Sequence, residues 1–329
     1  MIFKCNNCGG NVLYNPEKGQ MRCPHCDSVD SQQKITGEQS LQNCINCGAP
    51  LKVKDYASAT PCEHCGCSII FDERVEGEYR PHLIVPFAVS KRKAKEILRE
   101  RFKKKAFTPS NFLSENMLES MTGMYVPFFL YDINVRCDYR AEGTKRRVWT
   151  SGDTEYTEIS YYDIVREMYV DFDKIPVDAS VNMENTVMDL MEPYDYKALQ
   201  PFKEELMSGF SGEMYSVDAE QMRPRAREKA VSNAETMLNQ SVSGYSTVHT
   251  IHKNFMTQQC ATNYTLMPVW HYQYVYAGRA YDYYINGQTG KAVGETPVSK
   301  AKLFGYGGTV FGLLTIMMIA LKFMLGGGF

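Results

Sequence analysis

Alternation of apolar and polar residues predicts several β-strands in the middle of this 329-residue chain. Large apolar or aromatic residues occupy about every second position in residues 126–143 and 267–290, as they do in half-buried strands. Further strands are expected in residues 156–168 and 247–259. The second alternating run contains Gly residues at positions typical of tight turns, which predicts a meander.

Three other segments are predicted to be helices: residues 91–107, 196–208 and 218–241. Asp218 is the expected N-cap of the last one, because it precedes a first turn that contains Glu and Gln. Strands and helices do not alternate in a regular βαβ order. Residues 79–300 are therefore predicted to form an α+β domain with a mainly antiparallel sheet.

Proline lies between two apolar residues at four places in this region, and proline is tolerated at the first residue of a strand. We therefore expect a strand to begin near each of them: Pro86, Pro127, Pro176 and Pro268. The two long alternating runs that follow Pro127 and Pro268 are offset by 141 residues. This offset suggests an internal duplication of the domain.

The end of the chain is apolar on every side. Residues 303–321 contain no charged side chain, and as a helix they would extend over roughly the 30 Å of a bilayer core. We predict one transmembrane helix at residues 303–325, the alternative being a buried core helix of a soluble protein. Gly308 and Gly312 form a small-xxx-small spacing that lets two helices approach closely, so a second membrane protein is a candidate partner.

Positive residues just before the span favour the cytoplasmic side for the rest of the chain; they are Lys291, Lys300 and Lys302. No signal for secretion follows Met1. The expected location is the cell membrane, with a single C-terminal span and a cytoplasmic soluble part.

Eight of the eleven cysteines form two sets with the same spacing, C-x2-C, fourteen residues, C-x2-C. Two such pairs direct four thiolates at one ion, which predicts two structural Zn²⁺ sites. Disulfides are the alternative, and they fit a reducing cytosol poorly. The predicted ligands are Cys5, Cys8, Cys23 and Cys26 in one site, and Cys44, Cys47, Cys62 and Cys65 in the other.

These sites define zinc ribbons at residues 1–30 and 44–72, joined by a polar linker at residues 31–43 that we expect to be flexible. Four protein ligands close each site to water, so zinc catalysis is not expected. Cys67 is a competing ligand in principle.

The overall formal charge is −2, but the ribbons are more acidic than this average. Residues 1–78 carry seven Lys and Arg against ten Asp and Glu, and each four-thiolate zinc site adds a further −2. This charge repels a phosphate backbone. We therefore predict ribbons that contact proteins, and we keep nucleic-acid binding, related to replication or transcription, as the alternative.

The helix expected at residues 91–107 is strongly basic, with nine Lys and Arg in residues 91–105. A basic amphipathic helix can lie on anionic lipid, whereas the alternative is a helix packed on the sheet with a solvated outer face. The residues that would face lipid are Lys91, Arg92, Lys95, Arg99, Lys103, Lys104 and Lys105.

No known catalytic motif or phosphate-binding glycine loop occurs in the sequence, and no small-molecule substrate is evident. His249 and His252 lie three residues apart in an expected strand, which should place them on opposite faces. We predict that the protein is not an enzyme.

Three stretches carry a family resemblance: "YVPFFLYDINV" (125–135), "EPYDYKALQPFKEELMSGFSGEMYSVD" (192–218) and "MPVWHYQYVYAGRAYDYYINGQTGKAVGETP" (267–297). With the ribbons before them, they resemble a family of Gram-positive bacterial proteins with TFIIB-type zinc ribbons. Members are also labelled after the primosomal helicase, but this chain has no helicase motor motif. Phe129 stands where the family pattern has tryptophan.

The resemblance implies a membrane-anchored recruiter of cytosolic proteins in the envelope-stress response. The partners that it implies are flotillin-like SPFH proteins and phage-shock-protein A homologues. The predicted function is thus a non-catalytic adaptor.

Overall fold

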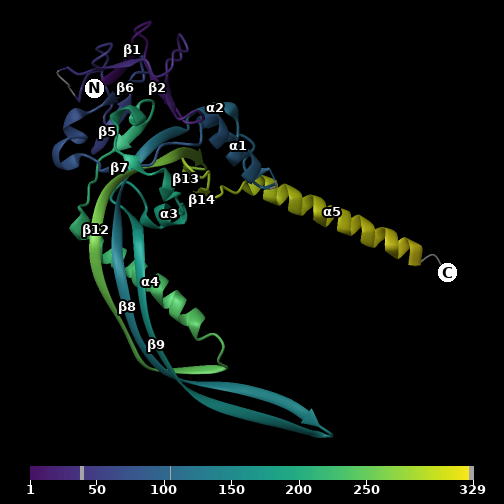
Figure 1. The fold of residues 1–329 in the computed structure, drawn as a ribbon. Helices are drawn as coiled ribbons and strands as arrows, with labels where there is room; N and C mark the ends of the chain where they lie inside the picture. The colour runs from purple at the N-terminus through teal and green to yellow at the C-terminus, as the bar shows by residue number, and fades with distance from the viewer. Residues whose placement is uncertain (38–40, 104, 326–329) are drawn as a thin grey trace.

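A ten-stranded sheet forms the centre of the computed structural model, which describes residues 1–37, 41–103 and 105–325. Its main path is β10-β7-β12-β8-β11-β5-β6, with β9 beside β8, β13 beside β12 and β14 beside β13 (Figure 1). The strands are β5 (Ala57–Pro61), β6 (Ser68–Ile70), β7 (Leu83–Ile84), β8 (Thr122–Ser151), β9 (Thr154–Asp178), β10 (Gln200–Pro201), β11 (Ser211–Glu213), β12 (Thr247–Tyr276), β13 (Arg279–Asn286) and β14 (Ala292–Gly294). Most neighbours are antiparallel, so the predicted α+β class is confirmed.

Three strands, β8, β9 and β12, are unusually long and form a curved arm below the rest of the molecule (Figure 1). β8 lies between the other two and pairs antiparallel with both. One-residue register shifts interrupt the ladders near Asp132, Ile251 and Cys260. Such bulges bend a strand and increase its twist, which accounts for the curvature of the arm.

Helix α4 (Ala219–Ser241) covers the concave side of the arm (Figure 1). Four small or apolar side chains spaced four residues apart are buried along it: Ala226, Ala230, Ala234 and Leu238. Alanine leaves little volume between helix and sheet, so the helix lies close to the strands. The predicted N-cap is confirmed, because the Asp218 carboxylate accepts a hydrogen bond from the Gln221 backbone N–H at 2.8 Å.

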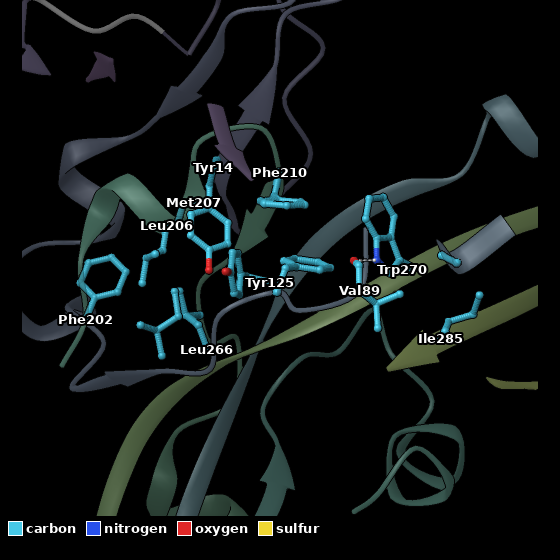
Figure 2. Close-up of a cluster of buried hydrophobic side chains, with 14 of the residues drawn as sticks. Tyr14, Val89, Tyr125, Phe202, Leu206, Met207, Phe210, Leu266, Trp270 and Ile285 are labelled. Atoms are coloured by element: carbon cyan, nitrogen blue, oxygen red, sulfur yellow. Dashed lines mark hydrogen bonds between the residues drawn. The ribbon is translucent and has the colours of Figure 1, made fainter. Parts of the chain in front are cut away.

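A cluster of aromatic rings forms the core above the arm (Figure 2). The Phe87 and Phe210 rings stack with centroids 4.0 Å apart, and Tyr125 meets them edge-on. The Trp270 indole N–H donates to the Val89 carbonyl oxygen at 2.8 Å, which satisfies its polar atom inside the core (Figure 2).

The strand segments 156–168 and 247–259 are confirmed as parts of β9 and β12. The turn between β12 and β13 is made by Ala277 and Gly278, which both have positive φ, as a tight two-residue hairpin requires.

The helix predictions are only partly correct. The first basic helix is α1, Lys91–Phe102, shorter than expected. The helix expected at 196–208 is wrong, because this segment contains two short 3₁₀ turns, Tyr196–Ala198 and Glu204–Met207. Two short helices went unpredicted: α2 (Glu115–Glu119) and α3 (Asn185–Leu190).

The expectation that prolines begin strands is wrong for all four. Pro127, Pro176 and Pro268 lie inside β8, β9 and β12, and Pro86 follows the end of β7. Pro127 is tolerated because the neighbour of β8 changes there from β9 to β11. The Pro127 carbonyl oxygen accepts a hydrogen bond from the Ala179 backbone N–H on the edge of β8 that faces β9 and β11. The N–H that proline lacks would point to the same edge, into the gap between the ends of β9 and β11, so no ladder hydrogen bond is lost. Val126 and Met267, which are 141 residues apart, pair directly, and the duplication stays a prediction.

The C-terminal helix α5 (Lys300–Leu325) projects away from the body (Figure 1). Its segment Lys300–Lys322 is long and apolar enough to span a membrane, and none of its hydrophobic window is buried against the body. This exposure is incompatible with the alternative of a buried core helix.

Candidate metal centres

Four copies of one backbone turn hold the eight cysteines. In each copy, the backbone N–H of the first cysteine donates a hydrogen bond to the carbonyl oxygen of the fifth residue after it. The carbonyl oxygen of the same cysteine accepts a hydrogen bond from the N–H of the fourth residue after it. The fourth residue after each first cysteine has positive φ: Gly9, Asp27, Gly48 and Gly66. Glycine adopts this conformation without strain, and aspartate tolerates it. The C-x2-C spacing thus folds locally into a knuckle that turns both sulfurs to one side.

The knuckles bring each predicted set of four sulfurs together, with all four atoms within 4.8 Å of one another. In ribbon 1 (residues 1–30) the Cys5 and Cys26 sulfurs are 3.6 Å apart, and those of Cys8 and Cys23 are 3.5 Å apart. In ribbon 2 (residues 44–72) the corresponding distances are 3.8 Å and 3.9 Å, between Cys44 and Cys65 and between Cys47 and Cys62. Each cluster can therefore hold one metal ion.

Within each knuckle the first cysteine is buried and the second is more exposed. The Ser28 hydroxyl lies 3.1 Å from the Cys5 sulfur, and this hydrogen bond lowers the pKa of Cys5 to about 6. The thiolate, which is the metal-binding form, is thereby favoured. Cys67 occupies the place in ribbon 2 that corresponds to Ser28, but it is not part of the described cluster. Its sulfur is buried, and burial raises the pKa of Cys67 to about 11.

The two ribbons are packed together, although the sequence predicts a flexible linker between them. Part of the linker forms β4 (Gln32–Ile35), which pairs with β1 (Ile2–Cys5) of ribbon 1. Ile2 packs among the buried residues of ribbon 2, and the Asn11 side chain donates to the Cys65 carbonyl at 3.2 Å. Residues 38–40 of the linker lie outside the described residues.

Both ribbons are also joined to the main sheet. β5 and β6 of ribbon 2 are strands of that sheet. In ribbon 1, the hairpin of β2 (Leu13–Asn15) and β3 (Gln20–Arg22) places Tyr14 in the aromatic core (Figure 2). The Tyr14 backbone N–H donates to Ser208 at 2.9 Å. Each metal site therefore has one face toward the core and one toward solvent.

Comparison with known proteins gives one full-length relative, the uncharacterized protein YdjG of Bacillus subtilis (strain 168). It is 34% identical over 338 residues, and the alignment covers 99% of each chain. This chain belongs to the YdjG family. No protein-family model matches the chain, and no solved structure matches it.

In this member of the YdjG family, the basic residues of α1 are largely paired with carboxylates. Lys95 is buried and bridges Glu115 and Glu119 of α2, so it does not face lipid. Other pairs are Lys91 with Glu119, Arg92 with Glu17, Arg99 with Glu115 and Lys103 with Glu100.

The end of α1 nearest to α5 is still a candidate for lipid contact. The Lys302 ammonium donates to the Thr108 carbonyl at 2.8 Å, and the Phe107 and Tyr306 rings meet edge-on. Lys103 and Lys105 are exposed beside this junction, and for them lipid contact stays a prediction. Lys104 lies outside the described residues.

On α5 itself, a Cβ atom placed on Gly308 or Gly312 would meet no described atom within 4 Å. Gly308 is exposed on the helix surface and Gly312 is half-buried. Their role in helix packing stays a prediction.

The histidine prediction needs a correction. His249 pairs with Glu142 and His252 pairs with Arg140, because the bulge at Ile251 inserts one residue between them. Both histidines therefore lie on the same face of the arm. They are exposed and belong to neither described cysteine cluster.

A cleft of about 350 Å³ lies where ribbon 2 meets the sheet, lined in part by Lys54, Glu213 and His271. The His271 Nε2 atom is 2.8 Å from an Asp282 carboxylate oxygen. No hydrogen bond among the described residues joins His271 to a serine, threonine or cysteine. The cleft therefore lacks the nucleophile and base contact of a hydrolase, and the non-catalytic assignment stays a prediction.

Proposed function

We propose that this protein is a membrane-anchored, non-catalytic adaptor whose two zinc ribbons present docking surfaces to partner proteins. The observation that carries the proposal is the form of the metal clusters. Four thiolates close each site, and the outer halves of the knuckles are exposed while the inner halves pack into the body. A closed site leaves no position for a reacting water, so its contribution is structural.

Zinc is the ion that the sulfur geometry supports best. A Zn–S bond of about 2.3 Å gives a tetrahedron with edges of about 3.8 Å. The four close sulfur distances in the two clusters lie between 3.5 and 3.9 Å. Binding of two Zn²⁺ would stabilise the ribbons, because the free energy of metal binding adds to that of folding.

The helix α5 supplies the tether, and we place the soluble part on the cytoplasmic side. Lys300 and Lys302 lie at the start of the span, and positive flanking residues favour the cytoplasm. Reduced cysteines also suit that compartment, because a thiolate cluster competes poorly with disulfide formation in an oxidising one.

The partners that we propose are SPFH-type or phage-shock-protein A-type proteins. This choice of partners is based on the family resemblance described above. Nucleic acid is disfavoured as a ligand of the ribbons by their net negative charge.

Deleting a ribbon is a poor test, because both ribbons contribute to the core. We instead replace the exposed knuckle residues His25 and His64 by Glu, together and separately, in the full chain. Proteins captured from detergent extract are compared between wild type and variants, and zinc is counted per chain by mass spectrometry. The matched control replaces His249 and His252 on the arm in the same way.

The expected result is loss of the SPFH-type or phage-shock-protein A-type partner in the double knuckle variant, with two zinc ions retained. The arm variant should capture it normally. The docking role is wrong if the knuckle variant captures the partner as wild type does. The structural zinc assignment is wrong if the folded wild-type chain contains no zinc.

A further inference from the structure

The end of the arm is a two-stranded hairpin that no other described element covers. β12 begins at Thr247 opposite Thr144, so β8 and β9 continue alone from there to the turn at Ser151 and Thr154. We call residues 145–160 the hairpin tip. In Figure 1 the arm curves so that the hairpin tip points to the same side of the molecule as α5. Both of its faces are open.

Large apolar and aromatic side chains are exposed on this open hairpin. Trp149 and Tyr156 are cross-strand partners whose rings stack at a centroid distance of 5.6 Å. The Arg147 guanidinium lies over the Trp149 ring at 5.6 Å. Other exposed side chains at the tip are Val148 and Ile159. Trp149 is 43% exposed, whereas Trp270 in the core is 5% exposed.

The aromatic row continues along the same face toward α4. Tyr162 and Tyr245 meet edge-on, and the Lys145 ammonium lies over both rings at 5.3 Å and 5.2 Å. The row therefore combines aromatic rings with Arg and Lys. Side chains of this kind concentrate at the level of lipid headgroups, where the rings are half-buried and the charges stay hydrated.

The charge of the hairpin tip favours lipid over nucleic acid as its ligand. The hairpin tip carries three basic residues and three acidic ones, so it has no net attraction for a phosphate backbone. A zwitterionic or mixed headgroup layer needs no such excess. The direction of the tip in Figure 1 and the span formed by α5 together place a bilayer on that side of the molecule.

We propose that the hairpin tip is a second membrane contact, in which Trp149 and Tyr156 insert into the headgroup layer of the bilayer that α5 spans. This inference rests on the membrane anchor of the proposed function. The depth of insertion follows from the backbone. A two-stranded ribbon leaves outward-facing N–H and C=O groups unpaired at its edges, and the hydrocarbon core does not tolerate them. The contact is therefore confined to the interface.

The two tryptophans make a direct test possible. The full-length chain is reconstituted into vesicles of phosphatidylcholine and phosphatidylglycerol, with or without bromine on the acyl chain near the headgroup, because bromine quenches nearby indoles. Trp149→Phe gives the signal of buried Trp270 alone, and subtraction from wild type gives Trp149. In the matched control, W149F/Y169W, the reporter lies in the middle of β9, where Tyr169 is exposed.

We expect brominated lipid to remove most of the Trp149 fluorescence, and to leave the signals of the W149F and W149F/Y169W variants nearly unchanged. Bromine near the end of the acyl chain should quench Trp149 less. Equal quenching of wild type and W149F by brominated lipid overturns the proposal. The proposal is also overturned if Trp149 is shielded from iodide in the aqueous phase but is not quenched by bromine, because this result would indicate that a protein partner or a second copy covers the tip.

A separate alkaline wash of the vesicles tests the membrane anchor independently of the contact made by the hairpin tip. A chain that resists the wash but shows no quenching of Trp149 keeps its anchor and loses the tip contact. A chain that washes off loses the anchor, and the tip contact with it.

Discussion

Truncating Arg225 should test how the arm is attached to the rest of the molecule. Its guanidinium donates to Asp178 at the end of β9 at 2.7 Å, and to Asp189 on α3 at 2.8 Å. The Asp178 side chain is fully buried, and its other carboxylate oxygen has no hydrogen-bond partner among the described residues. Arg225→Met would thus leave a buried carboxylate without its cation.

The expected loss follows from that burial. Removing one partner of a buried ion pair costs about 3–5 kcal/mol, because the remaining charge is uncompensated. We expect a value near the lower end, since Asp189 is 39% exposed and can be hydrated. The double variant D178N/R225M should recover most of the loss, because it contains no buried charge at this position.

The loss should also depend on pH. Burial raises the pKa of Asp178 above its usual value, even though Arg225 opposes this shift. Without Arg225 the pKa of the folded state rises further, so the folded variant binds a proton more readily than the unfolded chain. The free energy of unfolding of the variant therefore falls as pH rises from the pKa of Asp178 in the unfolded chain to its raised pKa in the folded variant. At low pH, where Asp178 is protonated, the difference in stability from wild type shrinks.

The assay is urea unfolding of the full chain in mild detergent at about pH 8 and at about pH 5. Unfolding is monitored by the fluorescence of Trp270 in a W149F background. Arg227→Met is the matched control, since Arg227 is exposed on the same helix. The reasoning is refuted if R225M and R227M unfold at the same urea concentration, or if the effect of R225M is larger at the lower pH.

Four further variants address the ribbons and the helix packing. Cys67→Ser should retain two metal ions per chain and Cys65→Ser should retain one, as counted by mass spectrometry; loss of an ion in C67S would make Cys67 a ligand. Ala230→Leu should lower the free energy of unfolding by about 1–3 kcal/mol, because overpacking would push α4 away from the strands; unchanged stability would contradict the close packing. Tyr14→Ala should destabilise the whole body by about 3 kcal/mol in urea unfolding, whereas no change in the Trp270 transition would mean that ribbon 1 folds separately.

Local features of this protein could be predicted from the sequence because each depends on residues close together in the chain. The C-x2-C spacing determines a knuckle, since only a tight turn fits between two thiolates that share an ion. The uncharged stretch before Lys322 is long and apolar enough to span a membrane, and Asp218 is a cap by its place before a helix.

Local patterns also misled where distant residues decide the outcome. Lys95 belongs to a basic helix in sequence, but Glu115 and Glu119 approach it from α2 and bury it. His249 and His252 share a face because of a bulge in the ladder with β8, which no spacing rule within one strand can show.

The largest features were decided by tertiary structure alone. The sequence determined two ribbons, a strand-rich domain and an apolar tail, each from its own periodicity or spacing. Only the fold placed β5 and β6 of ribbon 2 in the same sheet as β8, and left the end of the β8–β9 hairpin without a third strand. The physical reason is that strand pairing joins residues far apart in the chain, so its partners depend on how every other apolar face is buried.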